Sequence, residues 1–88
     1  MYELRIYIID NTPSSKKAIS SLKSLLEDEF KGLYSLEIID LLENPELAEK
    51  DKIFATPTVI KALPLPARKI LGDISSREKV LVGLGLVN

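Results

Sequence analysis

The 88-residue chain contains no cysteine, no histidine and no tryptophan. Without cysteine it can form neither a disulfide nor a catalytic thiolate, and without histidine it cannot build a His-based catalytic triad. The usual ligands of structural zinc are missing as well. These absences favour a protein that binds other proteins over an enzyme, and they predict no metal and no cofactor. A chain without disulfides also fits a reducing compartment, so we expect a cytoplasmic protein.

A strong excess of one charge is lacking too. Twelve basic and thirteen acidic residues give a net charge of −1, which predicts binding neither to nucleic acid nor to an anionic membrane. The first ten residues include Glu3 and Arg5 and therefore predict neither a signal peptide nor a membrane span. A chain of 88 residues has room for one core, so residues 1–88 are expected to form a single domain.

The first half predicts a strand, a long helix and a second strand. Residues 2–9 alternate at first and then become continuously apolar, which is typical of a strand buried on both faces of a largely parallel sheet. Thr12 and Pro13 are the expected cap and first residue of an amphipathic helix that Gly32 ends. Residues 34–42 predict the second strand, which completes a right-handed βαβ unit.

A second cap-and-proline pair, Asn44-Pro45, predicts a short helix over Leu47 to Ile53 with a surface ion pair between Glu46 and Lys50. The next strand is expected to begin in the segment Ala55 to Ile60.

The C-terminal part has conflicting local preferences. A short strand is expected over Ala67 to Leu71, followed by a turn at Gly72-Asp73 and a capping box at Ser75-x-x-Glu78. The tail Val80 to Val87 combines β-branched residues with two glycines, so local propensity leaves helix and strand both open.

The predicted element order βαβαββα, with Thr56-Pro57 before the third strand, resembles the thioredoxin-like α/β fold. That resemblance implies a cis bond before Pro57; a trans proline at a strand edge is the alternative. Where thioredoxins carry their two redox cysteines, this chain has the segment Thr12 to Ser15. Hydroxyl groups cannot form a disulfide, so redox catalysis is excluded.

Two further patterns could indicate chemistry. Ser14-x-x-Lys17 has the spacing of a serine activated by a neutral lysine, but Lys17 is expected on the polar helix face, which makes a small Ser/Lys hydrolase a remote alternative. The run Glu27-Asp28-Glu29 places its carboxylates on different helix faces, which is typical of a solvated charge run and not of a metal site.

The chain resembles the KaiB family of clock proteins over nearly its whole length. The matching segments are Asn11-Thr12-Pro13, Leu41 to Ile53, Ala55 to Thr58, Leu63-Pro64, Arg68 to Asp73 and Arg77 to Leu81. The resemblance implies a non-enzymatic protein that binds the ring of a KaiC-type ATPase. It also implies a fold switch between this thioredoxin-like state and a resting fold rearranged after about residue 51, in which the protein is a homo-oligomer, a tetramer or a dimer.

By the same resemblance, the partner-binding residues are expected around the short second helix: Glu46, Glu49, Lys50 and Lys52. The residues associated with the fold switch are Pro57, Pro64, Pro66, Gly83 and Gly85, the last of which stands where the family often has aspartate.

Glu37 and Glu43 replace lysines of the surface that captures KaiA, so KaiA binding is not carried over to this chain. The alternative within binding modules is a KaiB-like N-terminal sensor domain of a SasA-type histidine kinase, and competition with such a kinase pathway is a further expectation. Gly72-Asp73 and the segment Arg77 to Leu81 favour KaiB itself.

Overall fold

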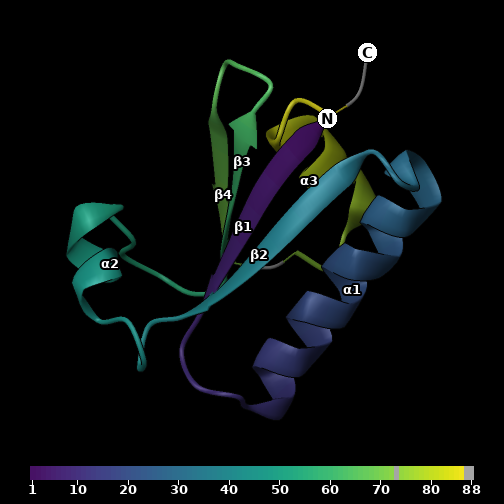
Figure 1. Ribbon diagram of the computed structural model, residues 1–88. Helices are drawn as coiled ribbons and strands as arrows, with labels where there is room; N and C mark the ends of the chain where they lie inside the picture. The colour runs from purple at the N-terminus through teal and green to yellow at the C-terminus, as the bar shows by residue number, and fades with distance from the viewer. Residues whose placement is uncertain (73, 87–88) are drawn as a thin grey trace.

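The computed structural model describes residues 1–72 and 74–86. It has the predicted element order: β1 (Tyr2–Ile8), α1 (Pro13–Phe30), β2 (Tyr34–Asp40), α2 (Glu46–Lys50), β3 (Thr58–Leu63), β4 (Arg68–Leu71) and α3 (Arg77–Gly83). The four strands form one sheet in the order β2-β1-β3-β4 (Figure 1). The thioredoxin-like α/β architecture expected from the sequence is confirmed.

The sheet is mixed and not largely parallel as predicted. Strand β1 pairs with β2 in parallel, but the β1–β3 and β3–β4 pairs are antiparallel. Helix α2 is a single turn beyond the end of the sheet, so the chain re-enters the sheet from the end at which β2 left it (Figure 1). The third strand therefore runs opposite to the first two.

Helix α1 begins where the sequence predicts. Thr12 has extended backbone, its side chain accepts a hydrogen bond from the Ser15 amide, and Pro13 occupies the first turn. Its apolar face buries three leucines, Leu22, Leu25 and Leu26, against the sheet. The helix ends before Gly32, whose φ of 75° is a conformation that glycine adopts without steric cost.

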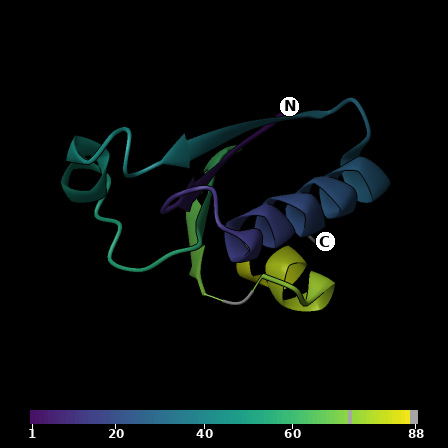
Figure 2. The same cartoon turned by 90° about the horizontal axis from the view of Figure 1, so that it is seen from below.

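The two faces of β1 belong to different clusters. Leu4, Ile6 and Ile8 point to the face covered by α1 and α3, whereas Tyr7 points to the opposite face, where α2 packs. In Figure 2 helices α1 and α3 lie together on one side of the sheet, and α2 lies apart at its end. The continuous burial predicted for this strand is thus limited to residues 6–8, and Arg5 and Glu3 remain exposed.

The connection from β2 to α2 differs from the prediction. Strand β2 ends at Asp40 instead of Leu42, because the Asp40 carboxylate accepts hydrogen bonds from the amides of Asp10 and Leu42 and turns the chain. The Asn44 side chain donates to the Asp40 carbonyl and does not cap α2. Pro45 is the residue before the helix, which covers only Glu46–Lys50.

The first part of the tail, for which helix and strand were both open, is helical: α3 continues through Val80 and ends at Gly83. Its cap is Ser76, whose hydroxyl accepts a hydrogen bond from the Lys79 amide, and not Ser75 as the capping-box pattern predicted. Ile74 is buried in the core, and Ser76, two residues later, has the extended backbone conformation of a residue that precedes the first helical turn. Two positions in this half that the sequence singled out, Asp73 of the expected turn and Val87 of the tail, lie outside the described residues.

Over the part of the chain that the structure describes, we find no helix with the length and apolar character needed to cross a membrane.

Candidate functional site

The four charged residues predicted to contact a partner are all exposed. Glu46, Glu49 and Lys50 lie three and four positions apart and so share one face of α2, and Lys52 follows two residues after its end. The ion pair expected between Glu46 and Lys50 is absent from the ion pairs of residues 1–72 and 74–86. An exposed pair of this kind contributes only about 0.3–0.5 kcal/mol, too little to order two side chains on a five-residue helix.

The other face of α2 holds it to the sheet. Leu47 and Ala48 are partly buried and pack against a small cluster of four buried residues: Tyr7, Ile39, Leu41 and Ile53. Leu47 therefore has a core role. The charged face is presented to solvent on a helix whose apolar face is fixed.

Two large apolar side chains are exposed in the segments that precede and follow α2 in the chain, and local sequence patterns do not identify them. Phe54 is 85% exposed and Leu42 is 60% exposed. Each directly follows a buried residue, Phe54 after Ile53 and Leu42 after Leu41, so the sequence pattern does not distinguish the exposed side chain from the buried one. We call Leu42, Glu46, Glu49, Lys50, Lys52 and Phe54 together the α2 surface.

Lys52 has a left-handed backbone conformation with φ of 56°. Such a conformation is uncommon for a residue with a long side chain and is maintained here by its neighbours. The Lys52 carbonyl accepts a hydrogen bond from Lys69 Nζ on β4 at 3.2 Å, and the next amide, that of Ile53, donates to the Ala48 carbonyl at 2.7 Å. These bonds orient the exposed lysine relative to both α2 and the sheet.

A buried tyrosine ties α2 to the central strand. The Tyr7 hydroxyl donates a hydrogen bond of 2.7 Å to Asp51 Oδ2, and Asp51 is the residue that ends α2. Burial raises the pKa of Tyr7 above its usual value, the hydrogen bond to Asp51 raises it further, and nearby Arg5 opposes the change. The position of the α2 surface thus depends on a neutral tyrosine in the sheet.

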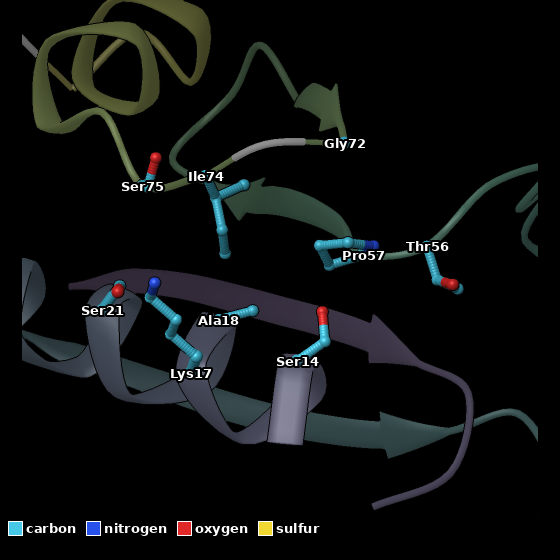
Figure 3. A pocket seen from close by; sticks show the side chains of 9 residues that line it. All are labelled: Ser14, Lys17, Ala18, Ser21, Thr56, Pro57, Gly72, Ile74 and Ser75. Atoms are coloured by element: carbon cyan, nitrogen blue, oxygen red, sulfur yellow. The ribbon is translucent and has the colours of Figure 1, made fainter. Parts of the chain in front are cut away.

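A cavity of about 390 Å³ lies between the first half of α1, the residues just before β3 and the residues after β4 (Figure 3). Ser14 and Lys17 both line it. In Figure 3 the Ser14 hydroxyl points toward Pro57, whereas the Lys17 amine points away from Ser14 toward Ser21. A lysine that activates a serine must be buried to lose its proton, but Lys17 is exposed. This geometry does not support the Ser/Lys hydrolase.

The segment in the redox position of thioredoxins acts as a helix cap. The Thr12 hydroxyl donates to Ser15 Oγ at 3.0 Å while it accepts from the Ser15 amide at 3.1 Å. These hydroxyl groups satisfy one another and the first turn of α1.

The acidic residues outside α2 form no metal centre within residues 1–72 and 74–86. In the run from Glu27 to Glu29, Asp28 forms an ion pair of 2.6 Å with Arg77 and thereby links α1 to α3. Glu37 on β2, one of the two reversed charges, pairs with Arg5 at 3.5 Å. Glu43 is exposed.

The residues associated with a fold switch do not form one cluster. The peptide bonds before Pro57, Pro64 and Pro66 are all cis, and the first of these was expected. Pro57 precedes β3, while Pro64 and Pro66 lie in the connection between β3 and β4. Gly83 brings α3 close to β4, because a Cβ atom at this position would lie 2.5 Å from Ile70 Cγ2.

Comparison with known proteins gives a consistent result. Residues 5–86 match the family model described as the KaiB domain. The chain is 60% identical over 86 residues to the circadian clock oscillator protein KaiB of Rippkaea orientalis, which covers 98% of this chain and 83% of the relative. It is 58% identical over 86 residues to the protein of the same name from Synechococcus elongatus, with 98% and 84% coverage.

Solved structures agree on the fold. The N-terminal domain of Synechococcus elongatus SasA superposes with a TM-score of 0.78 at 22% identity, over 99% of this chain and 86% of that domain. A chloroplastic thioredoxin z superposes with a TM-score of 0.76 at 19% identity, over 98% of this chain and 77% of the thioredoxin. At these identities the likeness concerns the fold alone, whereas the sequence relatives share more than half of their residues with this chain.

Proposed function

Because the chain belongs to the KaiB family, we propose that it is a clock or timing protein that binds a KaiC-type ATPase ring through the α2 surface and modulates the activity or output of that ATPase. The observation that carries this proposal is the 60% identity, over 98% of the chain, to a relative named as a circadian clock oscillator protein. In this proposal the chain acts in the cytoplasm as one domain, binds no cofactor and catalyses no reaction of its own.

The geometry of the α2 surface supports its role as the docking site. It combines two exposed apolar side chains with charges of both signs, and one of the apolar side chains is an aromatic ring. Aromatic residues at the centre of an interface often carry much of the binding energy, while surrounding charges steer association. Phe54 is the proposed anchor, and Lys52 beside it the proposed steering charge.

The proposal also includes a second packing of the chain after about residue 51 and a homo-oligomer in that resting state. Support comes from α3, where the segment Val80 to Val82 contains two β-branched residues and the helix still ends at a glycine. A segment with weak local preference depends on tertiary contacts such as the close approach of Gly83 to Ile70, and a different set of contacts can favour a different structure.

The two reversed charges at Glu37 and Glu43 argue against KaiA as a partner. The likeness to the SasA N-terminal domain favours competition, because two proteins with one fold can present similar surfaces to a shared ATPase. The same likeness supports a second candidate function, that of a sensor domain of a SasA-type kinase. The difference between 22% identity to that domain and 60% to a KaiB favours the first candidate.

Size-exclusion chromatography of the purified chain with its cognate KaiC-type ATPase and nucleotide tests the proposal. We expect co-elution at micromolar concentrations. Lys52→Asn and Lys52→Glu separate charge from backbone, because asparagine tolerates the left-handed conformation and is neutral. Binding should weaken modestly with Asn and strongly with Glu, whereas Lys23→Glu on the exposed face of α1 should leave co-elution intact. Absence of any complex with the wild-type chain would refute the proposal.

A further inference from the structure

Lys61 on β3 is a charged residue in an apolar setting. Its side chain lies on the face covered by α1 and α3, since Lys61 pairs with Leu4 of the main core cluster, and the residue is only 3% exposed. Lysine is almost never buried to this degree without a partner. Among residues 1–72 and 74–86, however, Lys61 forms neither an ion pair nor a side-chain hydrogen bond.

A second cation lies directly beside it. Arg68 is opposite Lys61 in the β3–β4 pairing, so both side chains leave the sheet on the same face. Like charges placed opposite each other in a sheet destabilise the pairing. The only two ion pairs in the described part of the chain join Arg5 to Glu37 and Arg77 to Asp28, so no carboxylate there offsets these two cations.

Gly85 leaves the space between the two cations open. It is exposed and has φ of 67°, and a Cβ atom at this position would lie 3.6 Å from Arg68 Nε and 3.7 Å from Lys61 Nζ. No described side-chain nitrogen or oxygen is both fully buried and unpartnered, so the Lys61 ammonium must reach solvent although its stem is buried. Both cations therefore converge on one accessible point above the Gly85 backbone.

We propose that this point is a binding site for a small oxyanion, either a carboxylate or a phosphate. An oxyanion there would accept a hydrogen bond from the Arg68 guanidinium and one from the Lys61 ammonium, and charge-assisted bonds of this kind are among the strongest in proteins. It would also remove the repulsion across the β3–β4 pair. The site lies on the face opposite α2 and is independent of the docking surface proposed above.

Titration of the ¹⁵N-labelled protein with inorganic phosphate or with acetate, at constant ionic strength, tests this proposal by NMR. We expect saturable shifts of the amides of Lys61, Arg68 and Gly85 with at least one anion, and the two titrations distinguish phosphate from carboxylate. Lys61→Met keeps the buried stem and should abolish the response, whereas Lys23→Met should not change it. Absence of saturable shifts with both anions, or an unchanged response in Lys61→Met, would overturn the proposal.

A built-in carboxylate provides a second test that does not depend on Lys61→Met being folded. Aspartate and asparagine both tolerate the conformation of Gly85, and the distances allow a Cβ atom in ordinary contact. Gly85→Asp should have a melting temperature about 4–8 °C above that of Gly85→Asn at low salt and should no longer respond to either anion. Equal melting temperatures for the two variants, or a lower one for Gly85→Asp, would contradict the site.

Discussion

Tyr7 Oη and Asp51 Oδ2 are 2.7 Å apart, and this hydrogen bond joins the central strand of the sheet to the residue that ends α2. The two residues are 44 positions apart in the sequence, and Asp51 is also where the proposed rearranged segment begins. Together with the packing of Leu47 and Ala48, the bond therefore links the first half of the chain directly to the α2 surface.

Removal of the Tyr7 hydroxyl should weaken this link with little change in packing. We expect Tyr7→Phe to lower the free energy of unfolding by about 1 kcal/mol, with Asp51 still reaching solvent because it is half-buried. Amide hydrogen exchange should increase in α2 more than in α1. Uniform exchange in both helices would show that the bond does not position α2.

The raised pKa of Tyr7 predicts how stability depends on pH. The folded state keeps this phenol protonated to higher pH than the unfolded chain does, so its contribution is fully present below pH 10 and is lost as pH rises through the folded-state pKa. Chemical denaturation between pH 8 and 11 should show a steeper fall in stability for the wild type than for Tyr7→Phe. Identical slopes for the two proteins would contradict this assignment.

The cap of α3 can be tested by substitution at Ser76. Ser76→Ala removes the acceptor of the Lys79 amide and should cost about 1 kcal/mol, whereas Ser76→Asp keeps an acceptor and should stay near the wild type. Urea denaturation measures both. Similar losses for alanine and aspartate would show that the hydroxyl at position 76 does not act as the cap.

Core and surface leucines should respond very differently to truncation. Leu26 is fully buried between α1 and the sheet, so Leu26→Ala should destabilise the protein by about 2–5 kcal/mol. Leu33 is 60% exposed, so its replacement by alanine should change stability by less than about 0.5 kcal/mol. Comparable losses at both positions would contradict the burial described for α1.

The sequence predicted those elements whose signals are local. Helix α1 was located correctly because its cap, its proline and its apolar spacing act within a few residues of one another. The second helix was predicted to reach Ile53 but ends at Lys50, because the backbone turns left-handed at Lys52 and the Ile53 amide donates to the Ala48 carbonyl. The end of β2 likewise depends on the Asp40 carboxylate, which accepts hydrogen bonds from the amides of Asp10 and Leu42. The direction of β3 depends on where α2 lies relative to the sheet, and no local pattern specifies that.

The candidate site shows the same division. The charged residues of α2 were expected to contact a partner, and the structure shows them exposed, on the face that helical spacing separates from Leu47 and Ala48. Phe54 carries no such signal, since it follows buried Ile53 in an irregular segment. The meeting of Lys61, Arg68 and Gly85 requires the β3–β4 register and the turn after α3, so it is visible only in the folded chain.

The proposed fold switch predicts two sets of backbone amide signals. NMR spectra at high protein concentration should show slow exchange for residues after Asp51 and a single set for the segment Tyr2 to Phe30. Stabilisation of one state by the ATPase partner should remove the second set. A single set of signals at every concentration, with and without partner, would show that the chain has one fold.

The most direct test of the central claim is the dissociation constant for the cognate KaiC-type ATPase, measured by calorimetry for the wild type, Phe54→Ser and Leu33→Ser. Both substitutions remove an exposed apolar side chain. Phe54 belongs to the α2 surface, whereas Leu33 lies in the connection between α1 and β2, at the opposite end of β2 from α2. The account predicts at least tenfold weaker binding for Phe54→Ser and unchanged binding for Leu33→Ser, since loss of an interface anchor costs more than about 1.4 kcal/mol. Equal affinities for all three proteins would contradict the claim that the α2 surface binds the partner.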